Sequence, residues 1–167
     1  MTLSMYELSV PMVVRGLTVL SQYLDKASDF AVANDVVPAD LINARLAPDM
    51  LPLSGQVQRA SDTSKGAISR LTKIAAPSFP DTETTFTELK DRVSKTIAFL
   101  QTATAEDFAG SESKKIELKF LNTTLSGEDY LLLFVIPNFF FHVATAHDIL
   151  RNQGLNVGKL DYLGTFE

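Results

Sequence analysis

Apolar residues recur every three to four positions along most of the chain, which predicts long amphipathic helices. Helix starts are marked by Pro48, by the capping box that Thr85 forms with Glu88, and by the hydroxyl of Ser126. The pattern places four long helices at about residues 3–31, 48–74, from 85 to about 100, and 126–152. Pro11 lies on the polar side of the first helix and predicts a kink or a later start.

Three shorter features complete the predicted architecture. PADLINARL, with Pro38 at its first position, indicates a short helix after the first long one. The alternation in KIELKF and the turn residue Asn122 predict a β-hairpin near residues 115–125. Residues 155–167 are expected to form an extended segment. The predicted fold is therefore all-α: a four-helix bundle with a short helix after the first helix and a small β-hairpin before the fourth.

Composition narrows the class of protein. A length of 167 residues suits one domain, here residues 1–167. Twenty acidic against fifteen basic side chains give a net charge of −5, which argues against a nucleic-acid partner. The chain has no cysteine, so disulfides and thiolate ligands are excluded.

Neither a signal peptide nor a membrane span is predicted. The apolar run 131–146 is interrupted by Pro137, Asn138 and His142, and is shorter than a typical span. The first residues lack the basic region and continuous apolar core of a signal peptide. We therefore expect a cytoplasmic protein that does not associate with membranes.

The two histidines, His142 and His147, are the most obvious candidates for chemistry. Positions five apart on a regular helix point about 140° away from each other, so the pair cannot bind one metal ion. The chain offers no third histidine. We therefore predict no metal and no cofactor, and we place His147 at the rim of the bundle.

His142 belongs to a polar seam on an otherwise apolar helix, together with Asn138 and Thr145. Tyr130 lies near the start of the same helix and is a further candidate binding residue. Two interpretations remain open. His142 is either a core histidine whose hydrogen bonds are satisfied by Asn138 or by helix carbonyls, or it lines a pocket for a small organic ligand and moves a proton there.

The second predicted helix carries Gln58, Asp62 and Lys65 one turn apart. Such a trio is usually a solvated face, but Gln58 and Asp62 are kept as candidate binding residues. The fourth helix is apolar on every side and the first has two adjacent apolar stripes. This excess of apolar surface predicts a homodimer.

Several segments, in order, resemble one family. They are RLAPDMLPLSGQVQRASD, DTETTFTEL, SGEDYL, PNFFFHVATAHDILRNQG and GKLDYLG, and together they span nearly the whole chain. The family is an uncharacterised domain of unknown function within the DinB/YfiT-like superfamily of metal-dependent enzymes. The resemblance implies a four-helix bundle that is commonly dimeric.

The resemblance also bears on the metal. DinB-like enzymes typically bind a divalent ion with three histidines, one on the second helix and a pair four residues apart on the fourth. His142 resembles the first member of the pair, but its second member would fall at Ala146. The stretch Gln56–Asp62 has no histidine either. The superfamily's thiol-transferase and hydrolase activities therefore do not carry over.

These observations lead to one favoured hypothesis and two alternatives. The favoured one is a dimeric bundle that binds a small molecule between helices, without metal, with His142 transferring a proton if the protein is an enzyme. The second is a non-catalytic binding or interaction module whose fourth helix serves assembly. The third is a degenerate divalent-metal enzyme in which Asp62 replaces a lost histidine.

Overall fold

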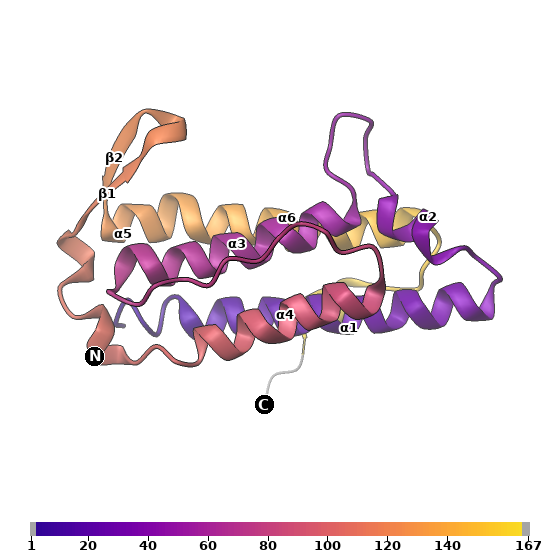
Figure 1. Cartoon of the computed structure of the whole chain (residues 1–167), viewed down its shortest axis with the longest axis horizontal. Helices are drawn as coiled ribbons and strands as arrows, with labels where there is room; N and C mark the ends of the chain where they lie inside the picture. The colour runs from indigo at the N-terminus through magenta and orange to yellow at the C-terminus, as the bar shows by residue number, and fades with distance from the viewer. Residues whose placement is uncertain (1–2, 165–167) are drawn as a thin grey trace.

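The computed structural model describes residues 3–164, and its four long helices form a bundle (Figure 1). They are α1 (Val10–Ala33), α3 (Leu53–Leu71), α4 (Phe86–Leu100) and α6 (Ile136–Asn152). Helices α1 and α6 run in one direction, and α3 and α4 run in the other (Figure 1). The predicted all-α bundle is confirmed.

Short elements connect the long helices. Helix α2 (Pro38–Asn43) follows α1, as predicted. Before α6 lie the 3-10 turns Ala105–Phe108, Ser111–Ser113 and Lys119–Leu121, strands β1 (Lys115–Leu118) and β2 (Thr123–Ser126), and helix α5 (Gly127–Asp129). The strands form the predicted antiparallel hairpin, which projects sideways from the bundle near α5 (Figure 1). Asn122 makes the turn with a positive φ of 48°, a conformation that asparagine tolerates.

Side-chain caps define two of the helix starts. Thr85 and Glu88 form a reciprocal capping box that begins α4, as predicted. Ser126 accepts a hydrogen bond from the backbone N–H of Asp129, at 3.0 Å, and so starts the last helical stretch.

Two helices begin later than the hydrophobic pattern predicts. Helix α1 starts at Val10 rather than near residue 3, with Pro11 in its first turn. Helix α3 starts at Leu53 rather than Pro48, directly after Pro52. A proline in or before the first turn gives up no helical hydrogen bond there, because the first N–H groups have no partner within the helix.

The last helical stretch is not a regular α-helix throughout. Tyr130–Val135 forms a π-helix between α5 and α6, and Pro137 lies in the first turn of α6. Proline has no N–H to continue the α-helical ladder, and the wider turn changes the rotation per residue. The position of Tyr130 relative to Asn138, predicted for a regular helix, is therefore altered.

The described part of the tail is non-helical over residues 155–158 and helical after them. Helix α7 (Lys159–Leu163) begins where the carboxylate of Asp161 accepts a hydrogen bond from the backbone N–H of Gly158. Arg15 of α1 donates to the carbonyl of Leu163. The expectation of an extended tail was wrong for Lys159–Leu163, because this capping contact stabilises a helical turn. Residues 165–167 of the predicted tail lie outside the described residues.

The core is built from the inner faces of all four long helices. Phe139 of α6 is fully buried and occupies the space that a side chain on Gly16 of α1 would need. The close approach of α1 and α6 therefore depends on a glycine.

By length and composition alone, the continuous helical stretch Gly127–Asn152 is long and apolar enough to cross a membrane. The sequence interpretation had judged the run 131–146 too short and too interrupted. The core helix of a bundle meets the same criterion. Here Phe139, Val143 and Ile149 are buried among the other helices.

Candidate functional site

A groove of about 550 Å³ runs between α3 and α6, at the face where the two helices pack antiparallel. Ligand sites in proteins commonly have volumes of this order. Its lining comes from α3, the α6 stretch, the hairpin and the loop before α3: Leu51, Arg59, Asp62, Thr63, Arg70, Phe120, Phe134, Asn138 and His142. Three of the six predicted site residues, namely Asp62, Asn138 and His142, line it together.

His142 is held by a partner from the opposite helix. Its Nδ1 lies 2.8 Å from Oε1 of Gln56. The amide nitrogen of Gln56 donates to the carbonyl of Leu51 at 2.9 Å, which leaves Oε1 to accept. His142 therefore carries its proton on Nδ1 and keeps the lone pair of Nε2. Nε2 has no hydrogen-bond partner among residues 3–164. The predicted partner, Asn138 or a helix carbonyl, was wrong.

His142 is neutral at physiological pH. Burial, assisted by the positive charge of Arg59, lowers the pKa of His142 to about 4. Desolvation disfavours the imidazolium form, and a neighbouring cation adds repulsion. The site therefore presents a neutral imidazole that can accept a hydrogen bond through Nε2.

The other predicted seam residues are placed differently. Asn138 donates to the hydroxyl of Thr63 at 2.7 Å, across the same helix pair. Thr145 is buried and does not line the groove. Tyr130 is also buried, and its hydroxyl accepts a long 3.4 Å hydrogen bond from Arg70 at the far end of the groove.

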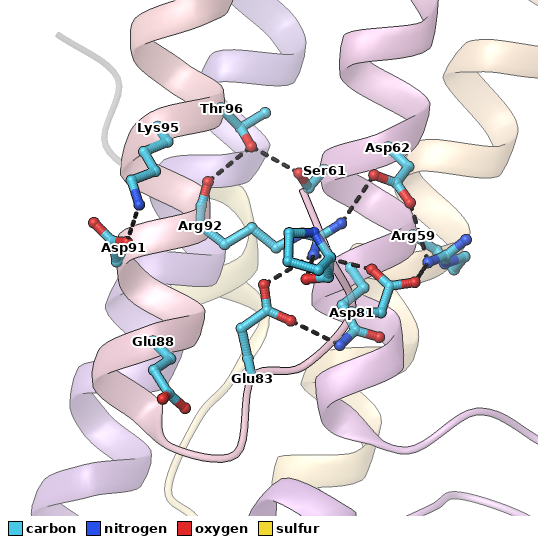
Figure 2. A network of polar contacts seen from close by, with 12 residues as sticks. Arg59, Ser61, Asp62, Asp81, Glu83, Glu88, Asp91, Arg92, Lys95 and Thr96 are labelled. Atoms are coloured by element: carbon cyan, nitrogen blue, oxygen red, sulfur yellow. Dashed lines mark hydrogen bonds and ion pairs between the residues drawn. The ribbon is translucent and has the colours of Figure 1, made fainter. Parts of the chain in front are cut away.

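Asp62 connects the groove to a network of ion pairs on the other side of α3 (Figure 2). Its carboxylate accepts from Arg92 of α4 at 2.9 Å and pairs with Arg59 at 3.0 Å. Arg92 also pairs with Glu83 at 2.8 Å and with Asp81 at 3.0 Å. The Arg92 guanidinium thereby ties α4 to α3 and to the connecting segment 72–85.

Gln58 belongs to this network rather than to the groove. Its amide donates to Glu83 at 2.9 Å. Burial raises the pKa of Glu83, but the hydrogen bonds from Arg92 and Gln58 outweigh it and hold that pKa below its usual value. As binding residues, Gln58 and Asp62 remain predictions.

The interpretation of Gln58, Asp62 and Lys65 as a solvated face was wrong for Lys65, which is buried, whereas Gln58 and Asp62 are partly exposed. Connecting segment 72–85 runs back along the bundle over α3 and α4 and covers this face (Figure 1). The ammonium group of Lys65 lies 3.9 Å from the ring centre of Phe79 and donates to the carbonyl of Pro77 at 3.2 Å. The side chain of Lys65 is only 6% exposed.

The residues present do not fit the three-histidine metal site of DinB-like enzymes. Ala146, where the second histidine of the pair would stand, offers no donor and is buried. Asp62, the conceivable substitute, is engaged by three cations, Arg59, Lys65 and Arg92. Within residues 3–164 no three histidine, cysteine, aspartate or glutamate side chains are grouped to hold an ion.

His147 lies elsewhere, at the α1 side of α6. Its Nδ1 is 2.8 Å from the hydroxyl of Tyr23. Burial raises the pKa of Tyr23, so its hydroxyl stays protonated and can donate to that nitrogen. The two histidines thus have separate partners.

Sequence reasoning missed Gln56, Arg70 and Arg92. Gln56 lies in the stretch of the second helix where DinB-like enzymes carry a metal-binding histidine. That resemblance was the only feature of the sequence that pointed to Gln56. Arg92 appears on the polar side of an amphipathic helix, a position that normally faces water. Only the path of segment 72–85 makes Arg92 a buried residue.

The comparisons with known proteins agree with the geometry. A crystal structure of a DinB family member protein from Shewanella denitrificans superposes with a TM-score of 0.92. It is 38% identical, and the match covers 96% of this chain and 92% of that chain. No curated protein matches the chain. Residues 5–163 match DUF1993, a domain of unknown function. The chain has the DinB-like fold and belongs to the DUF1993 family.

Proposed function

We propose that this protein binds a small organic molecule in the α3/α6 groove, where His142 accepts a hydrogen bond or a proton from it. One observation carries the proposal. His142 lines the groove in a single tautomer locked by Gln56, and its Nε2 has no partner among residues 3–164. Buried polar atoms in a core nearly always have protein partners, whereas Nε2 of His142 is not among the fully buried unpaired atoms and so is open to a ligand in the groove.

The low pKa of His142 shapes the available chemistry. A general base works best when its pKa lies near the working pH, and about 4 is well below that. Hydrogen-bond acceptance needs no ionisation and operates throughout the neutral range. Proton transfer to Nε2 would give an imidazolium whose Nδ1–H still donates to Gln56. Such transfer is confined to an acidic ligand, and the resulting anion would lie near Arg59.

The proposal is tested with a library of small organic fragments observed by ligand-detected NMR. The full-length protein is compared with Thr63→Trp, which fills the middle of the groove, and with Thr63→Val, which removes the hydroxyl but leaves the space. We expect fragments that bind the unmodified protein to bind Thr63→Val and to be lost with Thr63→Trp. Fragments that bind the tryptophan variant equally well would show that the groove is not the site.

A second candidate function is a non-catalytic interaction module. Leu133 and Phe141 are 67% and 55% exposed on the outer surface of the last helical stretch. Large apolar side chains exposed in this way often mark a protein interface. This surface is separate from the groove lining, so assembly and ligand binding are compatible.

A further inference from the structure

The groove contains one guanidinium that has no acidic partner in the part of the chain that the structure describes. Arg70 makes no ion pair with any described residue; its contacts are with Tyr130, through the 3.4 Å hydrogen bond and a 5.9 Å approach to the ring. Arg59, in the same groove, is compensated by Asp62 and Asp81. The positive charge available to a ligand is therefore that of Arg70.

A glycine makes room for this guanidinium. Gly66 lies one turn before Arg70, in the interior of α3. A Cβ at Gly66 would lie 2.6 Å from Nη1 of Arg70 and 4.0 Å from the hydroxyl of Tyr130. Glycine in a helix interior weakens the helix. At position 66 this loss of helix stability is offset by the space that glycine leaves for the guanidinium. The guanidinium of Arg70 lies back along α3 beside Gly66, and the residue remains exposed to solvent.

Aromatic rings form the wall beside the guanidinium. Tyr130 stacks on Phe134 with ring centres 5.7 Å apart, and Phe134 approaches Phe120 of the hairpin connection at 5.6 Å. Tyr130 and Phe134 both lie in the π-helical segment, and such segments frequently occur at functional sites. Phe120 is 68% exposed, so this aromatic wall is accessible from solvent.

We propose that the ligand of the groove is an organic acid, whose carboxylate binds Arg70 and whose apolar body lies on Phe134 and Phe120. This inference rests on the proposed function of the groove. Guanidinium groups bind carboxylates through paired, charge-assisted hydrogen bonds. One uncompensated cation matches a singly charged carboxylate, whereas the second charge of a phosphate dianion would have no uncompensated cation in the groove among the described residues.

The positions of Arg70 and His142 set the length of the ligand. The guanidinium lies at the level of Gly66, and His142 lies at the level of Gln56, ten residues away along α3. At the rise of an α-helix this separation is ~15 Å. An acid that also reaches Nε2 of His142 therefore has an extended body.

The test compares 4-phenylbutyrate with its neutral isostere 4-phenylbutyramide by calorimetric titration of the full-length protein. We expect the carboxylate to bind at least about tenfold more tightly than the amide. Arg70→Gln should reduce this preference to less than about threefold. Lys73→Gln removes an exposed positive charge nearby but outside the groove lining, and should leave the preference unchanged.

Gly66→Ala supplies a second variant that is not expected to impair folding. The new methyl group displaces the guanidinium, so the carboxylate preference should fall while the melting temperature stays the same or rises. Equal binding of the two compounds by the unmodified protein, or a preference that survives Arg70→Gln, would overturn the inference and leave the groove intact as a binding site. Binding of neither compound would contradict both the inference and the proposed function.

Discussion

At the scale of single residues, the orientation of the His142 ring is fixed by a hydrogen bond to a neutral amide and not by an ion pair. Gln56 is only 1% exposed, and its two hydrogen bonds, to Leu51 and to His142, leave its amide in one orientation. Burial and Arg59 keep the imidazole neutral. The hydrogen bond to Gln56 survives protonation of His142, but burial and the charge of Arg59 make the imidazolium costly in the folded protein.

The free energy of unfolding should consequently decrease as the pH is lowered from the unfolded-state pKa of His142 towards its folded-state pKa. In the unfolded chain its pKa is near the ordinary 6.5, whereas in the folded protein it is about 4. Between these values the unfolded state binds more protons, so the free energy of unfolding decreases as the pH falls. We expect a loss on the order of 2 kcal/mol between pH 7 and pH 4.5, measured by urea unfolding.

The control for this experiment is His142→Gln, measured under the same conditions. Carboxylates that titrate at lower pH are present in both proteins, so the difference between the two curves isolates His142. The variant should lose much less stability over this range. An identical pH dependence in the two proteins would show that His142 is not held neutral.

At the scale of elements, one buried arginine attaches connecting segment 72–85 to the bundle. The side chain of Arg92 is 1% exposed and bonds to Asp62 of α3 and to Glu83 of the segment (Figure 2). It also donates to the carbonyl of Pro80 at 3.2 Å. The segment has no helix or strand of its own between residues 74 and 80, so its path depends on such side-chain contacts.

Replacing Arg92 by leucine should therefore destabilise the protein strongly. The change leaves Glu83 partly buried without its cation, and the loss of one member of a buried ion pair typically costs about 3 kcal/mol or more. Urea unfolding at pH 7 measures the loss, and hydrogen exchange should show faster exchange in segment 72–85.

Lys95→Leu serves as the matched control on the same helix. Among residues 3–164, Lys95 pairs only with Asp91, and both side chains are more than half exposed. Exposed pairs of this kind contribute little, so the control should change stability by less than about 0.5 kcal/mol. A cost for Arg92→Leu no larger than that of the control would mean that the network is dispensable.

At the scale of the whole molecule, the bundle leaves apolar side chains uncovered along its last helical stretch. Leu132, Leu133 and Phe141 are 42%, 67% and 55% exposed, although the opposite side of the same stretch is core. The described residues of the hairpin and α7 do not cover them. A second copy of the chain would remove this surface from water.

We therefore predict a homodimer in dilute solution, with this surface at the interface. Light scattering at micromolar concentration should give twice the chain mass of 18.3 kDa. Phe141→Glu should shift the protein toward the monomer, because a carboxylate buried in an apolar interface is costly. Val32→Glu, at an 84% exposed position at the end of α1, is the matched control and should remain dimeric. A single-chain mass for the unmodified protein would contradict the prediction.

The helices were largely predictable from the sequence because their signals are local. Apolar periodicity gives the four long helices, and the Thr85–Glu88 box and Ser126 give two of the starts. The hairpin follows from strand alternation and from Asn122, which adopts the positive φ of its turn. The polar seam placed Asn138 and His142 on one side, and the structure places both in one groove.

Contacts between helices that are distant in the sequence could be identified only from the tertiary structure. Gln56 and His142 are 86 positions apart, and nothing in either segment specifies their hydrogen bond. Lys65 and Arg92 have the sequence pattern of solvated residues, and only the return path of segment 72–85 buries them. Local sequence determines which residues share a helix face, but the packing of helices decides which partner each face meets, because burial and hydrogen bonding depend on the surroundings that the whole chain creates.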